Sequence, residues 1–508
     1  MAIAPIPRLT ARQGHDPRKS DLSPPPNLPT HVVQGGVLLG GQRLVGLTVS
    51  GLGSIFLARW LTPEIFGTYA ILWFCIALAI NVSEMGLTAA LLLQPESRLR
   101  KELPSVATAQ LLVMVALAAA MAATTPVLID WLGLGPEAAW PLRAMAVLLP
   151  LSALRLVPAV KLERRLYYMP LTIADTIDTI VFYSVAVAAA YAGAGLWSFV
   201  IGILVGRVTS ITSLWVREPW WPILPIPWGE WRCTIRRGWA FQSTAMLVQA
   251  REAVAPILVR HLAGVPAVGL LNLASALALQ TVQMTNVATR VLFPTFVRLR
   301  EDDAAFGAAC ERALNRVAVI IVPATAFLCA TADPFVRLVY GTGWTAAIPS
   351  VRLFCLSALA GGLTMVAIHA LNALGHASVV FRLNLWWTIQ LWVLTLILVV
   401  PLGYVGFAVA HVIQGLASTL AFHHLRRLRP VRVLAQLQAP CTAAALVAAV
   451  LYVLTPWLRN LVLLAGAVSV AVAVYLCLLT LLSGSTWRAE IWREWRHVVD
   501  ARWSHGLS

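Results

Sequence analysis

Long apolar stretches dominate this sequence and restrict its fold more than any other feature. Fourteen segments between residues 37 and 482 approach the roughly 20 apolar residues that a helix needs to cross a bilayer. Only 12% of the 508 residues are charged, which is about half the share found in an average soluble protein. The sequence therefore predicts an all-α integral membrane protein with about 14 transmembrane helices.

Basic residues are distributed unevenly between the loops. Of the 38 Lys and Arg residues, 27 fall in the two tails and in the loops on one side, whereas the loops on the other side hold Arg59, Arg260, Arg337 and Arg459. The positive-inside rule then places both termini in the cytoplasm. Topology and contact with anionic headgroups account for the net charge of +16, so no nucleic-acid partner is expected.

A short pattern occurs twice, about two hundred residues apart. Residues 57–67 read LARWLTPEIFG and residues 258–269 read LVRHLAGVPAVG, each after an apolar run and each ending on a Gly that begins another. Six predicted spans lie between Arg59 and Arg260, so the two halves have the same orientation. This predicts two parallel six-helix lobes followed by two C-terminal helices, and parallel repeats recur among secondary transporters.

The predicted spans divide the chain into six parts. These are a disordered cytoplasmic tail (1–36), a first lobe (37–217), an amphipathic cytoplasmic linker (218–238), a second lobe (239–425), a basic loop with the last two spans (426–482) and a basic amphipathic cytoplasmic tail (483–508). A membrane-surface helix is expected in the final tail, and docking of biosynthetic proteins is a second role for it.

The second span of each half carries matching polar residues. With Gly67 aligned to Gly269, the pairs are Asn81 with Gln283, Glu84 with Asn286, and Thr88 with Arg290. This spacing puts each trio on one face of a continuous helix, and a polar face is costly against lipid. We therefore predict that Asn81, Gln283 and Asn286, together with Gln249, line an enclosed cavity. The alternative role is hydrogen bonding between neighbouring helices.

Arginines within predicted spans are candidates for binding an anion. An Arg at mid-bilayer costs roughly 2.5–3.5 kcal/mol even on the permissive insertion scale, so its presence calls for a reason. Guanidinium groups bind phosphate oxygens bidentately. We predict that Arg43, Arg251 and Arg290 form a phosphate or diphosphate site, with structural ion pairing as the alternative.

The acidic residues within spans are Glu84, Asp175, Asp178 and Glu252. All four are candidates for ion coupling. Asp175 and Asp178 share a helical face, and they either bind a coupling proton or Na⁺ or pair with Arg143 or Arg207. No metal site or cofactor is expected, because the cysteines lack ligand spacing and the chain has no P-loop for ATP. A proton or sodium gradient would then supply the energy.

Several segments carry a resemblance to a known family. Residues 57–96 resemble the opening hairpin of bacterial polysaccharide repeat-unit flippases of the Wzx and lipopolysaccharide-exporter kind, in the multidrug/oligosaccharidyl-lipid/polysaccharide exporter superfamily. Support comes from VLFPTFVRLRED (291–302), ADPFVRLVYGTGW (332–344) and ALNALGHASVVFR (370–382). The segment QRLVG (42–46) is also similar to the SRxxG of lipid II flippases, in which that Arg faces the cavity.

This resemblance implies a V-shaped pair of lobes around a cationic cavity in the inner membrane of a bacterium. It implies alternating access that moves an undecaprenyl-diphosphate-linked oligosaccharide to the outer leaflet, for polysaccharide or lipopolysaccharide biosynthesis. The implied partners are this lipid-linked substrate, membrane lipids, and a polysaccharide polymerase with other biosynthetic proteins. The alternatives are a drug/cation antiporter of the same fold and a membrane polymerase, which usually needs a longer outer loop than this chain has.

Overall fold

The computed structural model describes residues 45–84, 86–165, 167–222 and 228–483, and every regular element in these ranges is helical. Twelve helical segments there are long and apolar enough to cross a membrane. A shorter apolar helix, Val45–Trp60, and α9 (Trp228–Glu252) occupy the first and seventh predicted positions. The prediction of an all-α multi-pass membrane protein is therefore confirmed, with 14 as an approximate count.

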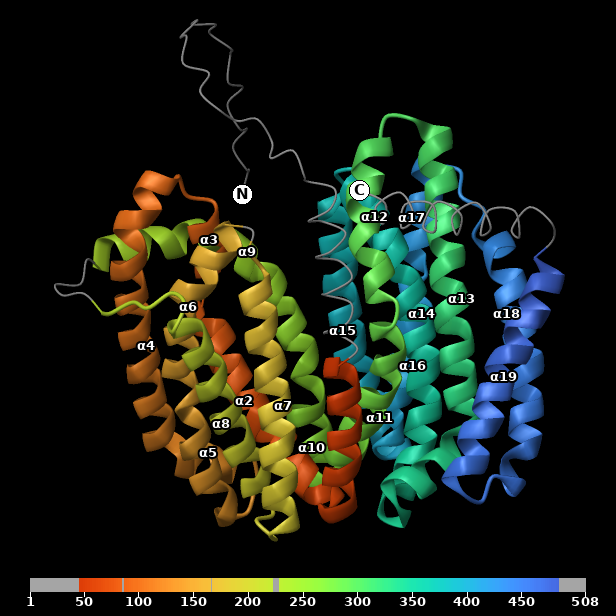
Figure 1. The fold of residues 1–508 in the computed structure, drawn as a ribbon, viewed down its shortest axis with the longest axis horizontal. Coiled ribbons are helices and arrows are strands. Elements are labelled where there is room, and N and C mark those ends of the chain that lie inside the picture. Colours follow the sequence, from red (N-terminus) through yellow and green to blue (C-terminus); the bar gives the residue numbers. More distant parts are fainter. Residues whose placement is uncertain (1–44, 85, 166, 223–227, 484–508) are drawn as a thin grey trace, which may run out of the picture.

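The two halves of the chain form two groups of helices that lie side by side (Figure 1). The first group contains helix 45–60, α2 (Pro63–Glu84), α3 (Leu87–Leu92), α4 (Glu96–Trp131), α5 (Ala139–Ala146), α6 (Leu148–Arg164), α7 (Met169–Tyr191) and α8 (Trp197–Trp215). The second contains α10 (Arg260–Ala263), α11 (Val265–Gln283), α12 (Asn286–Leu299), α13 (Asp303–Phe335), α14 (Ile348–Ala373), α15 (Ala377–Leu402), α16 (Val405–Ser418) and α17 (Leu420–Leu428). The last helices, α18 (Val433–Leu454) and α19 (Leu461–Leu482), flank the second group on the side away from the first.

Helix α9 connects the two groups. It packs against α3 and α4 of the first lobe and against α15 of the second. The predicted boundary between linker and second lobe, at residues 238 and 239, falls inside this continuous helix. Trp220 of the predicted linker is buried, and its indole N–H donates to the Leu154 carbonyl oxygen 3.3 Å away.

The sequence repeat marks the place where the lobes meet. Helices α2 and α11 begin at the two copies and cross at Gly67 and Gly269. A Cβ atom on Gly269 would lie 1.8 Å from the Pro63 carbonyl oxygen, and one on Gly67 would lie 2.1 Å from that of Val265. Small residues permit such close backbone approach between membrane helices, and here only glycine fits.

Aromatic packing closes the same end of the interface between the lobes. Trp344 is 2% exposed, and its indole N–H donates across the lobes to the Ala58 carbonyl oxygen at 2.7 Å. The ring of Phe66 lies edge-on to it, with 4.9 Å between centroids. Arg59 and Arg260 belong to this end, which is the outer side by the predicted topology.

The second span of each lobe is broken within its polar stripe. Helix α2 ends at Glu84, and α3 follows Gly86, whose φ of +70° only glycine adopts readily. Helix α11 ends at Gln283, and α12 starts at Asn286 after a turn. The helix is thus interrupted within each trio, although the Thr88 hydroxyl still donates to the Glu84 carboxylate at 2.6 Å.

Candidate functional site

A cavity of about 830 Å³ lies between the two lobes. One wall is formed by α2 of the first lobe, and the others are formed by α9, α11, α14, α15 and α16. Its volume is in the range of cavities that enclose small ligands. The crossing of α2 and α11 at Gly67 and Gly269 holds these walls in place at the predicted outer end.

The charged part of the cavity wall comes from the end of α9. Gln249, Arg251 and Glu252 all line the cavity, and neither charged residue forms an ion pair with another residue in the described ranges. A π-helical turn, Val254–Val259, follows directly and contains Pro256, which has no N–H to donate. Such turns widen a helix and are frequent at functional sites.

The second lobe supplies further polar groups to the cavity. Asn272 and Ser275, which continue the predicted stripe along α11, line it together with Asn384 of α15. Thr364 of α14 and Ser418 of α16 also line it, and their hydroxyl oxygens are hydrogen-bonded at 2.8 Å. The wall therefore offers amide and hydroxyl groups from four helices of the second lobe.

Aromatic rings complete the cavity. Tyr69 and Trp73 lie on the first-lobe wall, and Tyr69 stacks on a neighbouring phenylalanine ring. His411 of α16 lies against the rings of Phe354 and Phe407, with centroids 5.2 and 4.6 Å from its own.

One hydrogen-bond donor on this wall is unused. Trp387 is 5% exposed, and its indole N–H has no hydrogen-bond partner among the described residues. A buried donor of this kind costs about 1–3 kcal/mol when it is unsatisfied.

Of the residues predicted to bind substrate, the structure brings Gln249 and Arg251 to the cavity, together with the coupling candidate Glu252. Asn81 is not among the residues that line this cavity. Its side-chain amide donates to the Ala77 carbonyl oxygen of its own helix at 2.9 Å. Gln283 is the last residue of α11 and follows the cavity-lining Val282.

Three predicted residues are not placed by the structure. Arg43 lies outside the described residues, and the side chains of Asn286 and Arg290 are likewise outside what is described. Their roles stay predictions.

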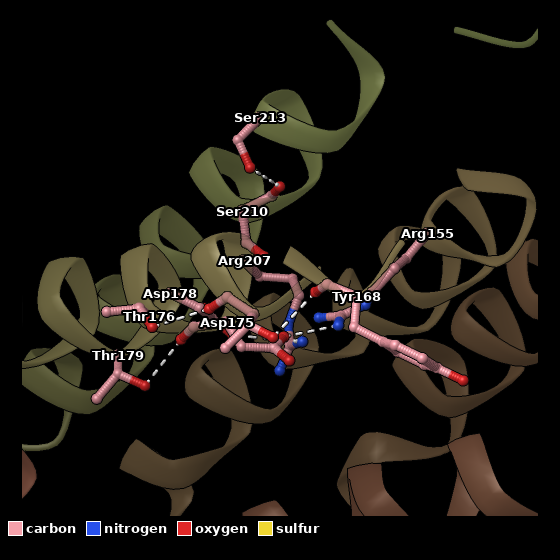
Figure 2. Close-up of polar contacts among 10 residues, drawn as sticks. Arg155, Tyr168, Asp175, Thr176, Asp178, Thr179, Arg207, Ser210 and Ser213 are labelled. Atoms are coloured by element: carbon pink, nitrogen blue, oxygen red, sulfur yellow. Dashed lines mark hydrogen bonds and ion pairs between the residues drawn. The ribbon is translucent and has the colours of Figure 1, made fainter. Parts of the chain in front are cut away.

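A second polar site lies within the first lobe. Asp178 of α7 pairs with Arg207 of α8 at 3.3 Å, which is one of the two partners expected from the sequence. Asp175 pairs with Arg155 of α6 at 2.6 Å instead of with Arg143. Figure 2 shows both arginines pointing toward the two aspartates on α7. This arrangement neutralises two of the four acidic residues proposed for coupling.

Glu84 lies beside this cluster. It lines a small cavity of about 240 Å³ together with Gln110, Arg155 and Arg207. Its carboxylate accepts a hydrogen bond of 2.6 Å from the Thr88 hydroxyl, and it forms no ion pair with any described residue. Glu84 and Glu252 are thus the candidates without an arginine partner in the described chain.

Sequence reasoning missed the contribution of α16. His411, Gln414 and Ser418 all line the cavity. Their spacing of three and seven residues equals that of the stripe noticed in α2, and it lies within an apolar span. The same periodicity argument, applied to this span, would have found them.

Comparison with known proteins identifies the family. The family described as "Polysaccharide biosynthesis protein" matches residues 56–349, which is more than half of the chain. The chain belongs to this family. The resemblance stated from the sequence is therefore confirmed, and the matched region includes both copies of the repeat.

Two relatives of this chain have names that refer to polysaccharides. The succinoglycan biosynthesis transport protein ExoT of Rhizobium meliloti (strain 1021) is 26% identical over 66% of this chain and 66% of its own length. The lipopolysaccharide biosynthesis protein WzxC of Escherichia coli (strain K12) is 27% identical over 26% of this chain and 27% of its own. The chain thus spans less than two thirds of the relatives it matches.

A solved structure shows the fold of this family member. The lipid II flippase MurJ in its inward closed conformation covers 90% of this chain and all of its own, with a TM-score of 0.75 at 16% identity. That likeness confirms the predicted V-shaped exporter fold with two lobes and additional C-terminal helices.

Proposed function

We propose that this protein moves an oligosaccharide linked to undecaprenyl diphosphate from the inner to the outer leaflet of the bacterial inner membrane by alternating access. The 830 Å³ cavity between the lobes carries this proposal, because its walls combine a guanidinium, amides and aromatic rings. Membership of the polysaccharide biosynthesis protein family, and the names of ExoT and WzxC, support a polysaccharide precursor as the substrate.

The lining residues match the chemistry of such a substrate. Arg251 offers a bidentate donor to a diphosphate. The amides of Asn272 and Asn384 suit the many oxygens of a sugar. The aromatic faces of Tyr69 and Trp73 suit the apolar C–H faces of pyranose rings. The prenyl chain stays in the lipid, so only the polar part needs the cavity.

We assign energy coupling to a carboxylate that can bind and release a proton or Na⁺. Asp175 and Asp178 are held by arginines, whereas Glu84 and Glu252 have no such partner in the described ranges. We therefore place the coupling ion at Glu84, in the small first-lobe cavity, or at Glu252, on the wall of the central one.

A leaflet-resolved assay in the native host tests this function. With the gene deleted, the lipid-linked oligosaccharide should accumulate on the cytoplasmic face, and the wild-type chain should relieve this accumulation. The Arg251→Ala variant should lower the rate of relief about tenfold, because charge-assisted hydrogen bonds to the diphosphate are lost. Arg251→Lys keeps the charge without the fork of donors and should fall between the two.

Arg459→Ala is the matched control, since this exposed arginine lies in an outer loop far along the chain from the cavity residues. It should relieve the accumulation like the wild type. Accumulation on the periplasmic face after deletion would contradict the proposal, because transport would then have succeeded and polymerisation would have failed.

A drug/cation antiporter is the second candidate, and the aromatic wall together with the exposed carboxylate of Glu252 favours it. The same deletion strain separates the two functions. A flippase predicts unchanged sensitivity to lipophilic cations. Raised sensitivity with a normal distribution of the lipid-linked oligosaccharide would favour the antiporter.

The proposed partners follow from the proposed substrate. Membrane lipids surround the helices, and a polysaccharide polymerase with other biosynthetic proteins would act before and after transport. The amphipathic tail at 483–508, predicted as a membrane-surface or docking segment, lies outside the described residues except for Ser483.

A further inference from the structure

The two arginines of the sequence repeat do not line the cavity. Arg59 lies in the last turn of helix 45–60, and its side chain crosses to the other lobe. Its Nε donates to the Val339 carbonyl oxygen at 2.8 Å, and its Nη2 donates to that of Leu338 at 2.6 Å. Both acceptors lie in the π-helical turn Val336–Tyr340, which continues α13.

Arg260 makes the reciprocal contact from the second lobe. Its Nη2 donates at 3.4 Å to the carbonyl oxygen of Trp131, which is the last residue of α4. The residue is 8% exposed, so the contact is largely shielded from water. Helix α4 is the third predicted span of the first lobe, and α13 is the third of the second. Each repeat arginine therefore reaches the third span of the opposite lobe.

The two acceptor sites are built alike. In each, one acceptor carbonyl, that of Trp131 or Val339, stands two residues before a glycine with a positive φ, namely Gly133 at +52° or Gly341 at +97°. The last carbonyl groups of a helix lack partners within the helix and form the negative end of its dipole. A guanidinium group donates hydrogen bonds to these carbonyl oxygens, and its positive charge is favourable at the negative end of the helix dipole.

We propose that Arg59 and Arg260 form a pair of reciprocal latches that hold the two lobes together on the outer side. The proposal rests on the alternating-access function above, in which this side must separate to release substrate. Both latches lie at the end where Gly67 crosses Gly269 and where Trp344 donates to Ala58. These hydrogen bonds can break reversibly, because water can accept from the arginine in place of the carbonyl oxygen when the lobes separate.

Accessibility of the cavity from outside tests the latches directly. In a chain whose seven native cysteines are replaced by alanine, Ser275→Cys places one thiol on the cavity wall. A membrane-impermeant maleimide added to the outer face of spheroplasts should label it slowly. Arg59→Gln should raise the labelling rate about tenfold. Arg260→Gln should raise it less, because Arg260 makes one longer hydrogen bond to the opposite lobe and its Nη2 also lies 2.6 Å from His261 Nε2 of its own lobe. Arg59→Lys should give an intermediate rate.

Three controls separate a latch from general loss of structure. Arg459→Gln removes an exposed outer charge and should leave the rate unchanged. Gly133→Ala should behave like Arg260→Gln, because a Cβ there would lie 2.6 Å from the Arg260 Nη1. Gly193→Ala has the same kind of backbone strain, at φ +81°, but no atom within 4 Å, so it should not raise the rate. Protein amount and melting temperature should match across the arginine variants.

The result is independent of what the protein carries. Equal labelling in Arg59→Gln, Arg260→Gln and Arg459→Gln would overturn the latches even if the leaflet assay supports the flippase. Faster labelling in the first two variants would support the latches even if that assay excludes a lipid-linked substrate.

Discussion

At the scale of single residues, a few glycines decide how closely the helices approach. Gly67 and Gly269 face backbone atoms of the opposite lobe, whereas Gly466 on α19 has open space around it. Residue type alone does not separate these positions, since both kinds lie in long apolar helices. The difference is whether a neighbouring backbone occupies the space that a Cβ atom needs.

This contrast predicts opposite effects of the same substitution. Gly269→Ala should destabilise the protein by about 1–3 kcal/mol, the usual cost of overpacking, because its Cβ would lie 1.8 Å from the Pro63 carbonyl oxygen. Gly466→Ala should be neutral or stabilise the helix by about 0.5–1 kcal/mol. Thermal denaturation in detergent measures both, and equal melting temperatures for the two variants would argue against the close crossing of α2 and α11.

At the scale of elements, ion pairs fix the helices of the first lobe to one another. Gly206 of α8 lies against Asp178 of α7, since a Cβ there would be 2.9 Å from both the carbonyl oxygen and a carboxylate oxygen of this aspartate. The close approach brings Arg207 within 3.3 Å of the Asp178 carboxylate, and the two side chains are 26% and 18% exposed. Removing one partner would leave the other charged and half-buried.

A double-mutant cycle tests this contact. Asp178→Asn should lower the free energy of unfolding by about 2 kcal/mol, because Arg207 loses its partner. Adding Arg207→Gln should restore most of the loss. The exposed pair Arg337–Asp333 provides the control, and breaking it should cost less than about 1 kcal/mol. Additive losses in the double variant would show that the two residues do not interact.

At the scale of the whole molecule, the charge of the loops sets the orientation in the membrane. Reporter fusions check the predicted topology. Alkaline phosphatase fused after Gly193, between α7 and α8, should be active because that loop is predicted to lie outside, and the same enzyme fused at the C-terminus should be inactive. A fluorescent protein fused at either terminus should be fluorescent. The opposite pattern would invert the model of transport from inner to outer leaflet.

Much of the architecture could be predicted from the sequence because its causes are local. Each apolar run must be helical in lipid, where every backbone group needs an internal partner, and this dictated the all-α fold. The repeat at Arg59 and Arg260 indicated two parallel lobes. Arg251 and Gln249 could be proposed as site residues because a polar side chain within an apolar span needs a reason.

Tertiary packing alone decided which polar residues meet. Asn81 bonds within its own helix, while His411 of α16, four predicted spans after that of α11, lines the cavity. The helices break at Gly86 and after Gln283, within the predicted stripes. Arg59 finds its acceptor 280 residues away, at Val339. Sequence periodicity gives a residue's position around its own helix, but its partners depend on how the helices pack, and that is fixed by contacts distant along the chain.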